Sequence, residues 1–205
     1  EPNALIETLR RAPGNDKAAF RLPVYGSAAV ETMLNEKHPY ERKYIKFNTV
    51  SHRQTITDVS HFRVTPLSVA HGRCKGAHAY VIEVQDRRVV VAFDLDTPEA
   101  VTASGRTNLQ VFEDARERGE LDDVDLLCLD ANTFRARGTG HNSIIDSADY
   151  LDVIQPKQTK LLHFSGSEDC ESDGRELLDD EVEEVTQRIY GPSVSMAAEG
   201  EMFSL

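Results

Sequence analysis

Hydrophobic and polar positions are patterned most clearly in the middle of the chain. Two runs rich in β-branched and aromatic residues, 79–84 and 88–93, flank the short polar stretch 85–87. This pattern predicts two antiparallel strands joined by a tight turn. Residues 89–93 (VVVAF) are apolar throughout, which predicts a central strand buried on both faces.

Helices and strands alternate along the rest of the chain. Helical spacing predicts helices over 107–118 and 143–154 and the end of a helix over 4–11, and Ser27 is placed to cap a short helix that follows it. The other predicted strands are 21–25, 44–47, 54–57, 62–69 with an edge or bend at Pro66, 125–130 and 160–164. This interleaving predicts an α/β protein with sheet and helix layers, not a helical bundle.

Acidic residues are concentrated at the C-terminal end. The formal net charge is −12, yet residues 165–205 alone hold 12 acidic and 2 basic residues, which leaves 23 acidic and 21 basic residues in the rest. Apolar residues in the acidic stretch recur at helical spacing, followed by a short strand at 193–196. We expect one domain over 1–205 that ends, within 165–205, in an acidic helix and a closing strand. The apolar positions of that helix are Leu177, Leu178, Val182, Val185 and Ile189.

Composition narrows the class of protein. No apolar run approaches the roughly 20 residues of a membrane span, so we expect no membrane partner. The three cysteines, Cys74, Cys128 and Cys170, form neither a disulfide framework nor a CxxC site, which favours the reducing cytoplasm. Residues 1–164 are nearly neutral, which argues against a nucleic-acid partner, because binding of nucleic acid requires clustered Lys and Arg. A small anionic substrate is compatible with the negative net charge, because one positively charged site can attract it against the electrostatic field of the whole protein.

Polar side chains follow several predicted strands, where layered α/β proteins place their active sites. Imidazole and carboxylate groups are ligands that zinc and manganese prefer. A histidine there is also common as a hydrogen-bonded surface residue, and an aspartate as a turn former or helix cap. Spacing alone leaves both interpretations open. The residues are His71, Asp94, Asp96, Asp130, His163 and, at the start of a helix, His141.

Six stretches carry a resemblance to a known family. They are LPVYG (22–26), FRVTPLSVAHG (62–72), AYVIEVQDRRVVVAFDLDT (79–97), DLLCLDA (125–131), GHNSIIDSA (140–148) and TKLLHFS (159–165). In this order and at this spacing they resemble the metallo-β-lactamase-fold phosphodiesterases. The branch is the one that holds the phosphoribosyl cyclic phosphodiesterase of phosphonate breakdown and the tRNA 3′-processing endonucleases.

The resemblance implies an αββα sandwich that binds two divalent metal ions, zinc or manganese. His71 would bind one ion, His163 the other, and Asp96 would bridge them, with Asp94 as the alternative register. His141 would act as the general acid or contact the scissile phosphate. The implied reaction is hydrolysis of a small cyclic or nucleotide-like phosphodiester by metal-bound hydroxide.

The chain departs from this family in one respect. The principal signature, HxHxDH, supplies four more ligands and occurs nowhere in the 205 residues. The resemblance therefore implies the C-terminal two-thirds of the fold, with too few ligands to close two metal sites. We expect a complementary N-terminal polypeptide or a homo-oligomer to supply the rest. His52, Asp58 and His61, at i, i+6 and i+9, are alternative ligands; the competing interpretation is that they are solvent-facing strand residues.

Two alternatives to an enzyme with an incomplete two-metal site stay open. The chain could use a reduced, mononuclear site, or it could be a catalytically inactive interaction or structural subunit built on the same fold. Retention of His71, Asp96, His141 and His163 favours an enzyme, because an inactive homologue has no chemical reason to keep four separate ligating or acid–base groups.

Overall fold

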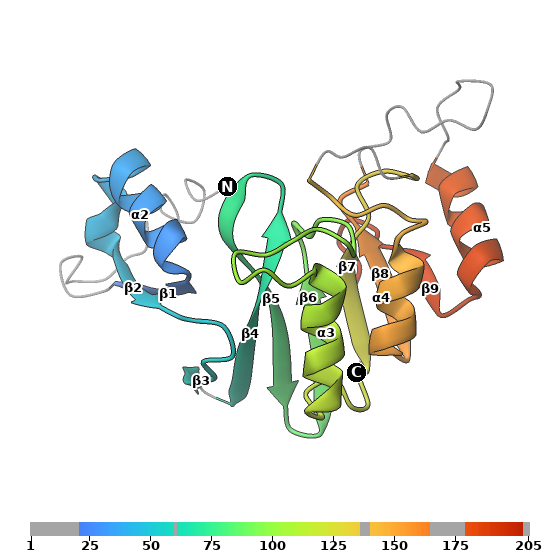
Figure 1. Cartoon of the computed structure of the whole chain (residues 1–205), viewed down its shortest axis with the longest axis horizontal. Helices are drawn as coiled ribbons and strands as arrows, with labels where there is room; N and C mark the ends of the chain where they lie inside the picture. Colours follow the sequence, from blue (N-terminus) through green and yellow to red (C-terminus); the bar gives the residue numbers. More distant parts are fainter. Residues whose placement is uncertain (1–20, 60, 136–139, 165–178, 203–205) are drawn as a thin grey trace. The chain divides into compact units, whose positions relative to one another are not determined.

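The structure, a computed structural model, describes residues 21–59, 61–135, 140–164 and 179–202 (Figure 1). The helix end expected over 4–11 lies outside the described residues. The chain divides into two compact units, Glu1–Ser51 and His52–Leu205. Within the described ranges, no helix is long and apolar enough to cross a bilayer.

The first unit pairs two parallel strands, β1 (Leu22–Gly26) and β2 (Ile45–Thr49). Helix α2 (Ala28–Lys37) lies between them in sequence, and a 3-10 turn, η1 (Glu41–Tyr44), precedes β2. As the sequence predicts, Ser27 is the N-cap of α2, and its hydroxyl accepts a hydrogen bond from the Val30 amide at 3.3 Å.

The second unit is built on a seven-stranded sheet in the order β3-β4-β5-β6-β7-β8-β9. Neighbours from β3 to β6 are antiparallel, and neighbours from β6 to β9 are parallel. The carboxyl ends of β6, β7 and β8 therefore meet at one edge of the sheet. The strands are β3 (Ile56–Val59), β4 (Phe62–His71), β5 (Cys74–Val84), β6 (Arg87–Ala92), β7 (Leu126–Asp130), β8 (Gln158–Leu162) and β9 (Val194–Met196).

Pro66 lies inside β4 without breaking the sheet. It pairs with Tyr80 of β5, whereas the pairing of β3 with β4 reaches only to Val64. The Pro66 carbonyl instead accepts a hydrogen bond from the Arg53 amide at 2.6 Å. The missing N–H of proline is thus tolerated at a local edge, as expected from the sequence.

Three helices connect the parallel strands of this sheet. They are α3 (Asn108–Glu117), α4 (Ser147–Ile154) and α5 (Asp179–Tyr190), and Figure 1 shows α3 and α4 side by side in front of the strands. A capping box starts α3: the Thr107 hydroxyl accepts from the Gln110 amide, and the Gln110 side chain accepts from the Thr107 amide.

The hydrophobic core lies between one face of the sheet and these helices. Val90 of β6 is fully buried together with Phe112 of α3 and Tyr150 of α4. Val89 and Val91 alternate with Val90 and are only half-buried. The prediction of a central strand buried on both faces is therefore wrong: successive side chains point to opposite faces, and the core cluster takes only one of them.

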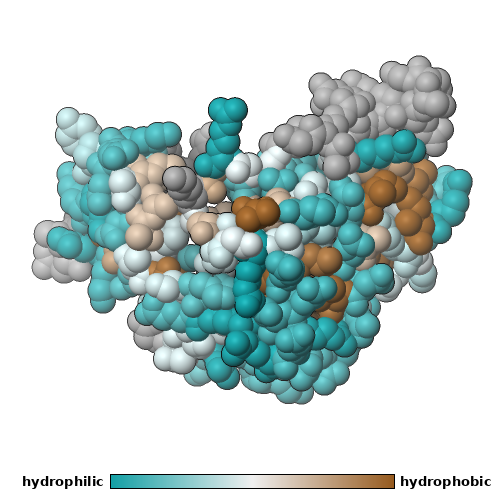
Figure 2. Space-filling model, in the orientation of Figure 1, coloured by the Kyte–Doolittle hydropathy of each residue, from teal (hydrophilic) through white to brown (hydrophobic). Residues whose placement is uncertain are grey.

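The outer surface is mostly hydrophilic over α3, and hydrophobic surface gathers beside α5 (Figure 2). Ile145 and Ile189 are among the large hydrophobic side chains that are exposed.

The Tyr190 hydroxyl donates hydrogen bonds to the Ile144 and Ile145 carbonyls at 2.6 and 3.0 Å. Burial raises the pKa of Tyr190 to about 12, so this donor keeps its proton and fixes the end of α5 to the segment before α4.

Candidate metal centre

Four side chains converge where β6, β7 and β8 end. Asp94 follows β6, Asp130 is the last residue of β7, His163 follows β8, and His141 precedes α4. One ligand atom from each lies within 4.8 Å of the other three. Two carboxylates and two imidazoles at this separation form a donor set typical of a divalent metal site.

The backbone is unusual at two of these positions. Asp94 has φ of 47° and His163 has φ of 69°, both in the left-handed region that non-glycine residues rarely adopt. Such a conformation costs on the order of 1–3 kcal/mol and persists where the surroundings impose it. At both positions it falls at the strand end that carries a member of the group.

Asp130 is the buried centre of the group. Its side chain is fully buried, and Oδ2 accepts hydrogen bonds from the Leu95 amide at 3.0 Å and from His141 Nδ1 at 2.8 Å. Burial raises the pKa of Asp130, and the hydrogen bond from His141 opposes that shift.

The second oxygen of Asp130 has no hydrogen-bond partner among the described residues, although it is buried. It lies 3.6 Å from His163 Nδ1, and Asp94 Oδ1 lies 3.7 Å from the same nitrogen. A buried carboxylate oxygen without a donor is costly. A cation among these side chains would satisfy it, so the donor set fits a divalent metal ion.

Three histidine rings form a row across the site. The His141 ring centroid lies 4.6 Å from that of His71 on one side and 4.6 Å from that of His163 on the other. His71 Nδ1 lies 2.8 Å from the Gly140 carbonyl oxygen. Because a carbonyl oxygen only accepts, Nδ1 carries the proton, and Nε2 of the neutral ring keeps its lone pair for another ligand.

Two glycines allow the segment before α4 to approach the end of β4. Gly140 has φ of +90°, and a Cβ built on it would lie 2.7 Å from Gly72 Cα and 2.9 Å from Gly72 N. Only residues without Cβ fit this contact. Since His71 and His141 are the immediate neighbours of these glycines, the close contact brings their two rings together.

Asp96 lies outside the four-residue group. Its Oδ2 accepts from the Gly72 amide at 3.1 Å, and its Oδ1 accepts from the Thr97 amide at 2.8 Å. Both contacts hold the carboxylate beside the turn that follows His71. The structure thus brings Asp94 into the group; the assignment of Asp96 and His71 as metal ligands stays a prediction.

Asn108 joins the same region from the start of α3. Its side chain is fully buried, accepts from the Ala70 amide at 2.7 Å, and donates to the carbonyls of Ala70, Asp96 and Thr97 at 3.2 to 3.3 Å. The amide therefore ties the end of β4 to the loop that carries Asp96. The sequence places this residue only as part of a helix.

Two of the alternative ligands that the sequence offers, His52 and His61, do not join this group. His52 Nδ1 accepts a hydrogen bond from the Ser68 amide at 2.9 Å, and His61 is an exposed residue between β3 and β4. The side chain of Asp58 lies outside the described part of the chain. His52 is therefore engaged in holding β4, which agrees with a structural role.

The fold is similar to that of several solved metallo-β-lactamase-fold proteins. The metallo-β-lactamase fold protein YhfI from Bacillus subtilis matches 98% of this chain and 71% of its own, with 17% identity and a TM-score of 0.65. Zinc-bound PqqB from Methylobacterium extorquens matches 98% and 69%, with 16% identity and a TM-score of 0.61. A diphosphatase of the PhnP family matches 88% and 57%, with 17% identity and a TM-score of 0.58.

These likenesses show that the chain has the metallo-β-lactamase fold, as its resemblance implied, and confirm the α/β class. The chain spans between 57% and 71% of the lengths of these three proteins. No protein-family model and no curated protein sequence matches the chain.

Proposed function

We propose that the chain forms the catalytic edge of a metal-dependent phosphodiesterase that acts on a small cyclic or nucleotide-like phosphodiester. The observation that carries this proposal is the buried, unpartnered Asp130 Oδ1 in a group of two carboxylates and two imidazoles among the described residues. The likeness to a PhnP-family diphosphatase supports chemistry at phosphorus.

His163, Asp94 and Asp130 would hold a divalent ion, and the predicted ligands His71 and Asp96 would extend the site to a second. Zinc and manganese both suit this donor set, and the zinc-bound neighbour supports zinc. When bound, such an ion polarises phosphoryl oxygens and lowers the pKa of a water molecule.

His141 is placed to move a proton. With Nδ1–H donated to Asp130 Oδ2 at 2.8 Å, Nε2 is the atom that holds or releases a second proton. A water oxygen forms a new bond to phosphorus and gives up one proton to solvent, while the bond to one ester oxygen breaks and the proton on His141 Nε2 passes to that departing oxygen. His141 then regains a proton from solvent. Asp130 stabilises the imidazolium before transfer and keeps the ring in one tautomer afterwards.

Further ligands are needed besides the five proposed ones, which are His163, Asp94, Asp130, His71 and Asp96. Two ions need more donors than these side chains supply, since a tetrahedral site needs four. The 205 residues hold no HxHxDH sequence. We propose that a polypeptide or segment carrying HxHxDH, or a second copy of the chain, completes the site.

Two histidine variants test the assigned roles. Both variants are measured in the assembly completed by a polypeptide that carries HxHxDH. Zinc titration should show that His163→Ala loses metal affinity and that His141→Ala retains it. Kinetic assays should show that His141→Ala loses the rate of bis-p-nitrophenyl phosphate hydrolysis. His61→Ala, an exposed histidine outside the group, is the matched control and should change neither property. If His141→Ala lost metal affinity as severely as His163→Ala, His141 would be a ligand and its catalytic assignment would be wrong.

Mixing tests completion of the site. The chain alone should bind zinc weakly and hydrolyse little substrate, and addition of a polypeptide that carries HxHxDH should raise both. Tight binding of two zinc ions by the chain alone would contradict an incomplete site. A stably assembled, metal-loaded pair without hydrolysis would instead favour a catalytically inactive interaction subunit.

A further inference from the structure

Two cavities adjoin opposite ends of the histidine row. His163 lines a cavity of about 700 Å³, and His71 lines a second of about 730 Å³. His141, in the middle of the row, lines neither cavity. Both volumes fall in the range of about 300–1,000 Å³ that is typical of small-molecule sites.

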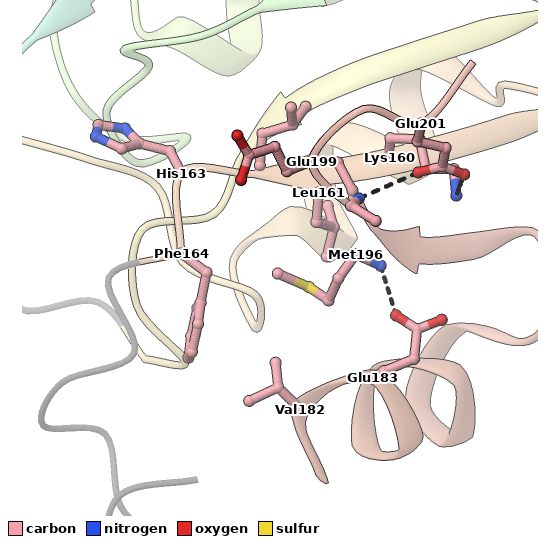
Figure 3. Close-up of a pocket in the computed structure, with 12 residues that line it drawn as sticks. Lys160, Leu161, His163, Phe164, Val182, Glu183, Met196, Glu199 and Glu201 are labelled. Carbon is pink, nitrogen blue, oxygen red and sulfur yellow. Dashed lines mark hydrogen bonds and ion pairs between the residues drawn. The ribbon is translucent and has the colours of Figure 1, made fainter. Parts of the chain in front are cut away.

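The cavity at His163 has an apolar wall and one free carboxylate. Figure 3 shows the His163 and Phe164 side chains leaving adjacent positions in different directions, with Phe164 directed toward Val182 and Met196. Glu199, which also lines this cavity, forms no ion pair or hydrogen bond with any residue in the described ranges. This cavity therefore suits an apolar group that is neutral or positively charged.

Hydrogen bonds fix the shape of this cavity. Glu183 of α5 accepts from the Met196 amide at 2.6 Å (Figure 3). Glu201 accepts from Lys160 Nζ at 2.6 Å and from the Ala198 amide at 3.1 Å. Three carboxylates and one ammonium thus line the described part of the cavity, and of these Glu199 is left for a ligand.

The cavity at His71 has the opposite charge. Its described lining includes the exposed Arg73, the exposed Val101 and Ala77, but no carboxylate. Burial, followed by the neighbouring Arg53, lowers the pKa of His52, so this lining histidine adds no charge at neutral pH. The guanidinium of Arg73 makes this cavity suitable for an anionic group.

We propose that the two cavities receive the two ester arms of an asymmetric phosphodiester, an apolar neutral or cationic arm at His163 and an anion-bearing arm at His71. This inference rests on the proposed function. The two ester oxygens of a tetrahedral phosphorus diverge, so a phosphate at the histidine row directs one arm toward each cavity. A phosphomonoester has one arm and fills one cavity only.

Binding of the separate arms tests the inference without catalysis. Benzylamine should shift the methyl NMR signal of Met196, which lines the His163 cavity. Phenylphosphonate should shift the methyl signals of Val101, which lines the His71 cavity. Met33 and Met202 line neither cavity and serve as internal references. Glu199→Gln should weaken benzylamine binding and Arg73→Gln should weaken phenylphosphonate binding. Exposed Glu117→Gln and Arg21→Gln are matched controls and should change neither. Both probes shifting the same methyl, or no shift with either probe, would overturn the inference.

Kinetics separate this inference from the proposed function. The completed enzyme should hydrolyse bis-p-nitrophenyl phosphate with a higher kcat/KM than p-nitrophenyl phosphate. Met196→Arg, which places a longer side chain in the lining of the His163 cavity, should raise KM for bis-p-nitrophenyl phosphate about tenfold, whereas Glu117→Gln should leave it unchanged. Failure to hydrolyse any diester would overturn the proposed function. Hydrolysis with an unchanged KM in Met196→Arg would overturn only the assignment of the cavities.

Discussion

His141 Nδ1 lies 2.8 Å from Asp130 Oδ2, and this contact links a half-buried histidine in the segment before α4 to a fully buried carboxylate at the end of β7. The same carboxylate presents its other oxygen, Oδ1, toward His163 at 3.6 Å. One side chain therefore orients the proposed proton donor and contributes to the proposed metal site. Its two oxygens serve different neighbours, so a change at Asp130 should affect both functions.

Asp130→Asn should lower both zinc affinity and the rate of hydrolysis, each about 10- to 100-fold, the usual effect of losing a group that supports metal-site residues. Asparagine keeps the shape and removes the negative charge. Zinc titration and kcat measurements test this, with Asp152→Asn, an exposed aspartate of α4, as the control. Unchanged zinc affinity would contradict the role of Asp130 in the metal site, and unchanged kcat would contradict its role in orienting His141.

Gly140→Ala should destabilise the fold more than Gly105→Ala. Both glycines have positive φ, +90° and +82°, but a Cβ at Gly140 would meet the Gly72 backbone at 2.7 Å, whereas a Cβ at Gly105 would meet nothing within 4 Å. The left-handed conformation alone costs about 1–2 kcal/mol in each variant, and the clash adds to that cost only at Gly140.

Urea denaturation gives the free energies of unfolding of the two glycine variants. Gly140→Ala should also lower the rate of hydrolysis by the completed enzyme, because separation from Gly72 moves His141, the proposed proton donor, away from His71. Equal losses of stability in the two variants would show that the segment before α4 yields without strain, and that the contact does not hold the rings together.

The sequence predicts the elements of the sheet well, because the period of apolar positions is a local property. The runs 79–84 and 88–93 correspond to β5 and β6, and the strand ends carry the polar residues that the pattern singled out. The burial of only one face of β6 could not be predicted from VVVAF, because that depends on which face the helices cover. A sequence reveals the alternation of buried and exposed positions along a strand only when the exposed positions carry polar residues, and in VVVAF they do not.

The structure places His141 and His163 together with Asp94 and Asp130, and the roles that the resemblance gives to the two histidines stay predictions. In the sequence, Asp130 was marked only by its position at a strand end. The participation of Asp94 depends on a left-handed backbone at that residue, which no local pattern in FDLDT indicates. Asn108 gave no signal, because its four hydrogen bonds join segments distant in sequence.

Asn108→Ala should lower the free energy of unfolding, because each buried polar group left unpaired costs about 1–3 kcal/mol. The Ala70 amide would lose its acceptor, which is the Asn108 side-chain oxygen at 2.7 Å. Hydrogen exchange at the Ala70 amide should become faster, and Asn35→Ala, an exposed change in α2, is the control. Unchanged exchange at Ala70 would contradict the positioning role.

Asp125 should make the stability of the protein depend on pH in the acid range. A hydrogen bond from Lys157 Nζ at 2.8 Å, followed by one from the Arg88 amide at 2.9 Å, lowers the pKa of Asp125 well below its ordinary value. The folded state therefore holds this carboxylate ionised at pH values where the unfolded chain, with a pKa of about 3.9, already binds a proton. The stabilisation is fully present above about pH 4 to 5 and is lost as the pH falls through the folded-state pKa.

The free energy of unfolding of the wild type should accordingly exceed that of Asp125→Asn at neutral pH, and the difference should shrink as the pH falls below about 4. Denaturant titrations at several pH values between about 7 and 2 measure it. Asp86→Asn, in the exposed turn between β5 and β6, should show a much smaller pH-dependent difference. A difference for Asp125→Asn that stayed constant down to the lowest pH would mean that the hydrogen bonds from Lys157 and Arg88 do not favour the ionised carboxylate.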